Sequence, residues 1–199
     1  MSSPPRRLDS VCVFCGSSES AAPALLAAAA ALGEILARDG VRLVYGGGGI
    51  GLMGACARAA HRAGGRVLGV IPAFLAPVES PPPTVETLVV ASMHERKMTM
   101  FEAADAFAIL PGTIGTLEET IELLSWRRLG LHAKPIVFYN PDGFWDPLFA
   151  LFGQFTERLL LPAEFADCWR AVDDIADMLP TLQAMPTAFM AAPGVTALI

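Results

Sequence analysis

The pattern in this sequence that most directly indicates chemistry is a group of three carboxylates. Glu118, Glu119 and Glu122 fall within about one and a half turns of a predicted helix, directly after a glycine turn at residues 111–115. Like charges this close destabilise a helix unless a cation or a function offsets them. Thr116 and Glu119 also fit a capping box, in which Glu119 would be structural. The residues alone leave both interpretations open.

Two basic residues, Arg96 and Lys97, are the candidate partners of those carboxylates. They border the apolar stripe of the helix predicted over residues 93–104 instead of lying opposite to it. A buried cation needs a carboxylate or phosphate partner, although long side chains can also extend along a surface to solvent. We favour an anionic partner. Ser92 and Glu95 fit a capping box, so Glu95 is predicted to be structural.

A second glycine-rich segment, GGGGIGLMG at residues 46–54, follows one predicted strand and precedes a helix. Backbone N–H groups and the helix dipole at such a place favour an anion, and the alternative is a tight turn with close packing. A dinucleotide site is disfavoured because residues 68–71 contain no acid for the ribose, and the Gly-Lys-Ser/Thr of a Walker loop is absent. Phosphate-binding glycines beside a carboxylate suggest chemistry on a phosphorylated sugar.

The elements that position these residues alternate between short apolar runs and helical patterns. This alternation predicts βαβ units and a parallel sheet, and runs such as VCVFC and AFAIL are typical of strands buried on both faces. We therefore predict one doubly wound α/β domain over residues 1–199, with its core at about residues 10–185 and helices on both faces of the sheet. In such folds ligands bind at the carboxyl ends of strands. The predicted strands are 10–15, 41–45, 66–71, 86–91, 106–110, 134–139 and 169–172; the predicted helices are 23–38, 51–62, 93–104, 117–128, 144–158 and 175–183; and residues 72–84, with five prolines, are predicted to be loop.

Composition and charge exclude several classes of protein. The chain is 53% hydrophobic and only 17% charged, which excludes intrinsic disorder. The net charge of −6 leaves no overall basic face for a nucleic acid. The longest uncharged apolar run, residues 21–33, is too short to span a bilayer, so we expect no membrane partner.

Cysteine usage and the N-terminus predict a cytoplasmic protein. Cys12 and Cys15 form a C-x-x-C on a predicted strand, where residues three apart point to opposite faces, so we expect buried thiols and no disulfide. Without a second C-x-x-C we expect no metal site. The pair Arg6 and Arg7 is followed by too short an apolar run for an export signal.

The C-terminal segment differs from the rest of the chain. Residues 178–199 contain no charged residue, while three prolines prevent one long helix. We expect the uncharged tail, residues 186–199, to be ordered and to cover either the core of its own chain or a partner subunit.

Three segments, taken in order, resemble the motifs of the LOG (Lonely Guy) family of nucleoside 5′-monophosphate phosphoribohydrolases, which release free cytokinin bases. They are GGGGIGLMG at residues 46–54, MHERK at residues 93–97 and PGTIGTLEE at residues 111–119. The resemblance extends from about residue 11 to about residue 172. It implies a Rossmann-like fold, no metal or organic cofactor, a nucleotide substrate, and a homodimer whose subunits share the active site.

The resemblance also implies roles for particular residues. Arg96 and Glu119 would be the catalytic pair, acting on AMP or an N6-modified AMP. The implied substrate-binding residues are Glu79, Lys97, Gly112, Thr113, Gly115, Thr116, Glu118 and Ser125, and the implied phosphate loop contains Gly47, Gly48, Gly49, Gly51, Met53 and Gly54. The family has Pro-Gly-Gly where this chain has Thr113 as the third residue, and the threonine hydroxyl could reach the phosphate.

Two alternative functions follow from the same motifs. The lysine decarboxylase label once given to this family requires a lysine that forms a Schiff base with pyridoxal phosphate. The chain has only Lys97 and Lys134, and neither comes with a recognisable pocket for that cofactor, so we reject this alternative. The second alternative is a non-catalytic nucleotide-binding module that resembles molybdenum-cofactor carrier proteins. Thr113 favours this module, and the presence of Arg96 together with Glu119 argues against it.

Overall fold

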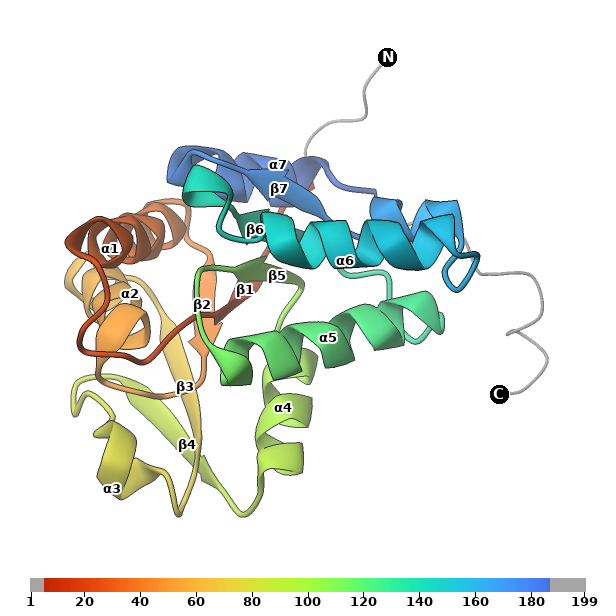
Figure 1. The fold of residues 1–199 in the computed structure, drawn as a ribbon. Helices are drawn as coiled ribbons and strands as arrows, with labels where there is room; N and C mark the ends of the chain where they lie inside the picture. Colours follow the sequence, from red (N-terminus) through yellow and green to blue (C-terminus); the bar gives the residue numbers. More distant parts are fainter. Residues whose placement is uncertain (1–5, 187–199) are drawn as a thin grey trace.

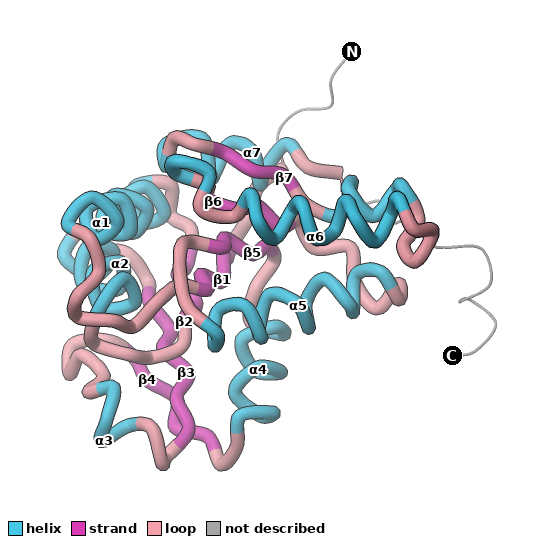
Figure 2. The backbone as a smooth tube through the Cα atoms, in the orientation of Figure 1, coloured by secondary structure: helices cyan, strands magenta, loops and turns pink. Residues whose placement is uncertain are grey.

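A parallel seven-stranded sheet in the order β4-β3-β2-β1-β5-β6-β7 organises the computed structural model, which describes residues 6–186 (Figures 1 and 2). Every neighbouring pair of strands runs parallel. The strands are β1 (Ser10–Phe14), β2 (Arg42–Tyr45), β3 (Val67–Pro72), β4 (Glu86–Val90), β5 (Ala106–Ile109), β6 (Ile136–Tyr139) and β7 (Arg170–Val172). The predicted doubly wound α/β fold is therefore confirmed.

The central strand β1 is where the order of the strands reverses. Its Val11 pairs with Leu43 of β2 on one side and with Ala106 of β5 on the other. The five residues of β1 and the four residues of β5 are all buried, because helices cover both faces of the sheet. The loops that follow β1 and β5 meet at the carboxyl edge of the sheet, where the Gly16 N–H donates to the Pro111 carbonyl oxygen at 3.1 Å. In doubly wound folds, ligands bind at this switch point.

Helices cover the two faces of the sheet and form a separate apolar cluster on each. One cluster includes Leu32 of α1 and Leu182 of α7, and the other includes Met100 of α4 and Phe152 of α6. The α-helices are α1 (Pro23–Arg38), α2 (Gly51–Arg62), α3 (Ala76–Glu79), α4 (Met93–Glu102), α5 (Ile114–Arg128), α6 (Asp146–Glu157) and α7 (Met178–Ala184); short 3-10 helices are η1 (Pro141–Gly143), η2 (Ala163–Cys168) and η3 (Ile175–Asp177).

The main departures from the sequence prediction occur in three segments. The segment 72–84 is not all loop, because β3 continues through Pro72 and the short helix α3 forms within it. The helix predicted over 117–128 begins three residues earlier, at Ile114, because Thr113 has extended backbone and ends the preceding turn. The helix predicted over 175–183 is divided into η3 and α7, and Pro180 lies in the first turn of α7, where proline is tolerated.

Cys12 and Cys15 have the environments that the strand pattern predicts. Both are buried and free, and they belong to apolar clusters on opposite faces of the sheet. Residues 187–199, most of the tail that was predicted to be ordered and to cover the core or a partner, lie outside the described residues. The assignment of all 199 residues to one domain stays a prediction. Within residues 6–186, no helix is long and apolar enough to cross a membrane.

Candidate active site

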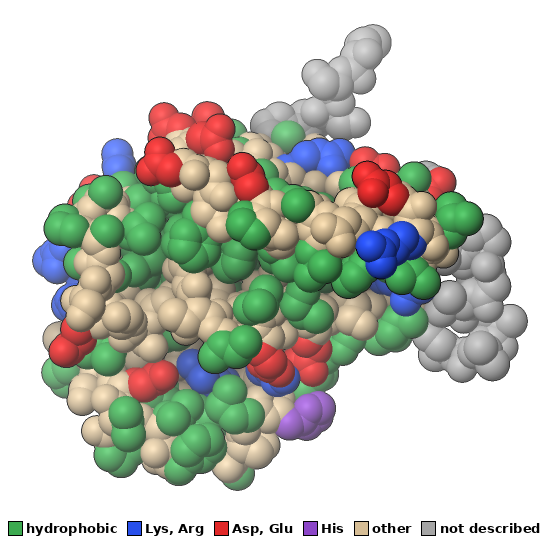
Figure 3. All heavy atoms as spheres, in the orientation of Figure 1, with side chains coloured by type: hydrophobic (Ala, Val, Ile, Leu, Met, Phe, Trp, Pro, Cys, Tyr) green, Lys and Arg blue, Asp and Glu red, His purple; other side chains and the backbone are tan. Residues whose placement is uncertain are grey.

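A small cavity of about 100 Å³ lies at the carboxyl ends of β1 and β5, where the order of the strands reverses. In the space-filling view, acidic and basic side chains alternate in a band between the region of α5 and the region of α3 and α4 (Figure 3). The cavity is lined by Cys15, Gly16, Ser17, Met53, Glu79, Met93, Arg96, Thr113, Gly115, Thr116, Glu118 and Glu119.

Glu119 is the buried acid of this cavity. Its side chain comes from the second turn of α5 and the residue is only 7% exposed. Burial raises the pKa of Glu119 to about 7, with further increases from Glu118 and Glu79, and the positive charge of Arg96 only partly opposes this rise. Among the described residues it has neither a hydrogen-bond nor an ion-pair partner. A carboxylate in this state can accept a proton or stabilise a positive charge near neutral pH.

The capping interpretation of Glu119 is wrong. Thr113, not Thr116, is the N-cap of α5, so Glu119 lies too far into the helix to cap its start. Ser92 does cap α4, since its Oγ accepts a hydrogen bond from the Glu95 N–H at 3.1 Å. The Glu95 carboxylate accepts a hydrogen bond from the Ala91 N–H at 2.8 Å, which confirms its predicted structural role.

Arg96 is a buried cation, 4% exposed, held mainly by backbone oxygens. Its Nη2 donates to the Gly46 carbonyl oxygen at 2.8 Å and its Nε donates to the Val70 carbonyl oxygen at 3.2 Å. The Glu79 carboxylate is the nearest acid, 3.9 Å from Nη2. Arg96 thus binds both the residue that follows β2 and a residue of β3, and its side chain lines the cavity.

Lys97 connects α4 to α5. Its Nζ forms ion pairs with the carboxylates of Glu118 and Glu122, the second at 2.9 Å. Burial lowers the pKa of Lys97, but the hydrogen bonds to these two carboxylates outweigh it, and the net pKa is raised. The anionic partner favoured from the sequence is confirmed for Lys97, and the cations of α4 do face the carboxylates of α5.

The glycine loop between β2 and α2 is packed against other backbone segments. The N–H groups of Leu52 and Met53, at the start of α2, both donate to the Gly16 carbonyl oxygen, at 3.0 and 3.4 Å. The Gly49 N–H donates to the Glu79 carbonyl oxygen at 2.7 Å. Of the implied phosphate loop, Met53 lines the cavity, while Gly47, Gly48, Gly49, Gly51 and Gly54 do not. A role of this loop in phosphate binding stays a prediction.

The second predicted anion site, at the start of α5, faces the cavity directly. Thr113, Gly115 and Thr116 line it, and the first turn of α5 carries no acidic residue. Gly112 lies under the Thr116 side chain, where a Cβ would come within 2.1 Å of Thr116 Oγ1. The cavity therefore meets the positive end of a helix dipole, next to two threonine residues.

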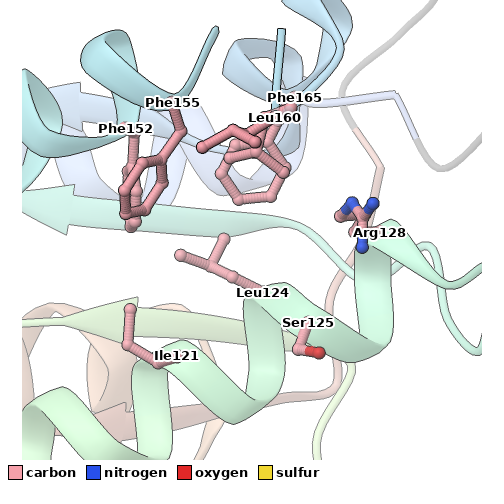
Figure 4. A pocket seen from close by; sticks show the side chains of 9 residues that line it. Ile121, Leu124, Ser125, Arg128, Phe152, Phe155, Leu160 and Phe165 are labelled. Atoms are coloured by element: carbon pink, nitrogen blue, oxygen red, sulfur yellow. The ribbon is translucent and has the colours of Figure 1, made fainter. Parts of the chain in front are cut away.

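Three predicted substrate residues, Lys97, Gly112 and Ser125, do not line the cavity, and Ser125 lies in another pocket. It lines a separate, mainly apolar pocket of about 320 Å³ between α5, α6 and η2 (Figure 4). In Figure 4 the Ile121 and Leu124 side chains of α5 face Phe152 and Phe155 of α6 across this pocket. Within one subunit, Ser125 and the cavity of Glu119 are separate.

Four residues of the cavity were not predicted as site residues: Cys15, Gly16, Ser17 and Met93. The first three follow β1, whose carboxyl end reaches the same edge of the sheet as β2 and β5. The rule that ligands bind at strand ends could have indicated them, had it been applied to the first strand as well. Among residues 6–186, no group of three or more His, Cys, Asp or Glu side chains is arranged to hold a metal ion.

The fold and the site together define a doubly wound, Rossmann-like α/β protein with a buried carboxylate at its switch point. A family model described as "Possible lysine decarboxylase" matches residues 53–182. The rice protein named "Probable cytokinin riboside 5′-monophosphate phosphoribohydrolase LOG4" is 42% identical over 86% of this chain and 75% of its own length. The Arabidopsis thaliana protein "Cytokinin riboside 5′-monophosphate phosphoribohydrolase LOG7" is 48% identical over 71% of this chain and 66% of its own. The chain belongs to the LOG family.

Solved structures of more distant sequence share the same fold. A molybdenum cofactor binding protein from Rippkaea orientalis matches with a TM-score of 0.66 at 22% identity, covering 87% of this chain and 94% of that one. The Moco carrier protein from Chlamydomonas reinhardtii matches with a TM-score of 0.67 at 20% identity, covering 90% and 98%. At these identities the likeness concerns the fold alone.

Proposed function

We propose that this protein is a nucleoside 5′-monophosphate phosphoribohydrolase. It hydrolyses the N-glycosidic bond of AMP or of an N6-modified AMP, and releases the free base and ribose 5-phosphate. The observation that carries this proposal is Glu119, a buried and unpartnered carboxylate with a pKa of about 7, facing a cavity beside Arg96. The printed names of the relatives describe the same reaction.

The charge around the cavity suits a transition state that becomes positive at the sugar. Cleavage of a glycosidic bond passes through an oxocarbenium-like state. Glu79, Glu118, Glu119 and Glu122 supply four carboxylates against the two cations Arg96 and Lys97. Glu119 stabilises the developing positive charge and accepts a proton from the attacking water. A proton passes to the nitrogen of the departing base, so that the elements of water add across the broken bond. Arg96, held by backbone oxygens, orients the ribose hydroxyls and keeps part of Glu119 ionised.

In this proposal the phosphate of the substrate binds at the start of α5. Lys97 is paired with two carboxylates and Arg96 is bound to carbonyl oxygens, so both cations already have partners. The N-terminus of α5 offers N–H groups and a helix dipole without a nearby acid in its first turn. Binding of the phosphate there orients the sugar relative to Glu119. This orientation accelerates the reaction, although the phosphate site takes no part in the bond cleavage.

The two lysines of this chain do not fit a pyridoxal phosphate enzyme. An imine requires a lysine amino group that is free in the pocket. Lys97 Nζ is paired with Glu118 and Glu122, and Lys134 Nζ donates to the Phe101 carbonyl oxygen and lies 4.1 Å from the centre of the Phe101 ring. Lys134 does not line the cavity. The family description as a lysine decarboxylase therefore has no support in these residues.

We further propose that the protein acts as a cytoplasmic homodimer that binds no nucleic acid. The apolar pocket is lined by Leu160, which is 66% exposed, and by Ile121 of α5, which is 40% exposed. Burying this surface against a second copy would remove apolar area from water, and it would bring Ser125 of one subunit near the interface. The free, buried cysteines fit a reducing compartment.

The test of the proposal compares three substrates with one purified protein. AMP, isopentenyladenosine monophosphate and adenosine are incubated separately, and the free base is quantified by chromatography. The proposal predicts base from the two monophosphates and far less from adenosine. If no monophosphate yields base above a Glu119→Gln control while AMP still binds at micromolar concentration, the protein is instead a non-catalytic nucleotide-binding module.

A further inference from the structure

Thr113 occupies the N-cap position of α5 without capping the helix. A threonine there ordinarily accepts a hydrogen bond from an N–H of the first turn, but the Thr113 side chain forms no such bond. Its φ of −110° and ψ of −155° are extended backbone, so the β-branched side chain fits without strain. The residue is exposed and lines the cavity.

The surroundings of Thr113 show what its hydroxyl can meet. The same cavity is lined by Glu119, which is more than nine-tenths buried and has no partner among the described residues. Such a carboxylate indicates that a ligand completes this cavity. The N–H groups at the start of α2 are already bonded to Gly16, whereas the start of α5 faces the cavity. A ligand anion at α5 would therefore come next to the Thr113 hydroxyl.

We propose that Thr113 is a specificity-determining residue whose hydroxyl donates a hydrogen bond to the 5′-phosphate of the substrate. This inference rests on the proposed function, because the ligand is its nucleoside 5′-monophosphate. A hydrogen bond to a charged group contributes more than one between neutral groups. The threonine thus increases the preference for a phosphorylated ribose over an unphosphorylated one.

The test uses the isosteric change Thr113→Val, which keeps the side-chain shape and removes the hydroxyl, together with Thr113→Ser, which restores it. Binding of ribose 5-phosphate and of ribose is measured by calorimetry, and kcat and KM are measured with AMP. We expect Thr113→Val to weaken ribose 5-phosphate binding about tenfold and to raise KM rather than lower kcat, since a lost bond to a charged group removes at least a factor of ten. Thr113→Ser should recover most of the loss, and binding of ribose should not change between the variants.

The controls separate phosphate binding from helix stability. Thr156→Val removes a hydroxyl on α6 that bonds only to Phe152, and it should leave ribose 5-phosphate binding as in the wild type. Because the Thr113 side chain makes no cap bond, Thr113→Val should also leave the Tm unchanged. Wild-type affinity in Thr113→Val, or a lowered Tm with equal losses for ribose and ribose 5-phosphate, would overturn the inference. A wild-type protein that binds ribose 5-phosphate but releases no base from AMP would instead contradict the proposed function.

Discussion

Arg96 Nη2 donates a hydrogen bond to the carbonyl oxygen of Gly46 at 2.8 Å, so the first residue of the glycine loop holds the buried guanidinium in position. A Cβ on Gly46 would lie 2.1 Å from Nη2, so a larger residue here would force the guanidinium to move. The loop after β2 therefore supports a cation of the cavity wall. Close packing, one of the two interpretations of the glycines, explains this position without a direct contact to phosphate.

Replacing Gly46 by alanine should displace the Arg96 guanidinium and lower kcat for AMP at least tenfold, because misplacing one group of a site by about 1 Å can cost this much or more. Gly153→Ala is the matched control. Gly153 lies within α6, where a Cβ would meet no atom within 4 Å, so this variant should keep its activity and gain about 0.5–1 kcal/mol of stability. Kinetics and urea unfolding of both variants test this; equal activities would show that Arg96 does not depend on Gly46.

The raised pKa of Glu119 makes folding stability depend on pH. Burial raises this pKa from 4.5 to about 7, so the folded state holds the proton more tightly than the unfolded state. Stability should therefore fall as pH rises from about 4.5 to about 7, by about 3 kcal/mol. Glu119→Gln cannot ionise and should lack this decline, which makes it more stable than the wild type at pH 8 and similar at pH 5. The urea unfolding midpoints of both proteins at pH 5 and pH 8 test this prediction. The same change in midpoint with pH for both proteins would contradict it.

We expect Lys97 to affect the reaction through the ionisation of Glu119. Its positive charge lowers the pKa of Glu119, and it neutralises Glu118 and Glu122 nearby. We expect kcat/KM of the wild type to rise with pH to half its maximum near pH 7, and Lys97→Met to shift this midpoint to higher pH. Lys97→Arg, which keeps the charge, should restore the wild-type midpoint. If Lys97→Met lowered the rate equally at every pH and left the midpoint unchanged, a structural role of the ion pairs would explain the loss, and the expectation would be contradicted.

The apolar surface beside α5 and α6 should hold two subunits together. Leu160 is 66% exposed and lines the apolar pocket, so Leu160→Asp should give a monomer in light scattering at concentrations where the wild type is a dimer. Phe74 is similarly exposed, at 60%, but lies after β3 and outside this pocket, and Phe74→Asp should remain a dimer. A monomeric wild type would show that there is no such interface. A dimeric Leu160→Asp would show that the interface lies elsewhere.

Most of the fold could be predicted from local patterns. Apolar runs such as residues 11–14 and 106–109 form the buried strands, and the Ser92 capping box marks the start of α4 where the structure has it. The start of α5 was misplaced because Thr116 offers the same capping pattern as a true N-cap. Local sequence cannot show that Thr113 already ends the turn with extended backbone.

The candidate site depends on contacts between distant segments, and these were only partly predictable. Arg96 and Glu119 could be paired from their residue types and from the family resemblance. That Arg96 binds Gly46 and Val70, or that the N–H groups of α2 are bonded to Gly16, depends on how the loops after β1, β2 and β3 pack together. Ser125 was assigned to the substrate from the family resemblance, but within one subunit it lines the apolar pocket.

The most direct test of the account is the time course of adenine and ribose 5-phosphate release from AMP at pH 8, with the wild type and Glu119→Gln side by side. The wild type should form the two products in equal amounts, and Glu119→Gln, although folded, should form at most about one hundredth as much, as expected for loss of a general base. Equal rates for the two proteins, or a wild type that releases no adenine, would contradict the central claim that Glu119 drives hydrolysis of the glycosidic bond.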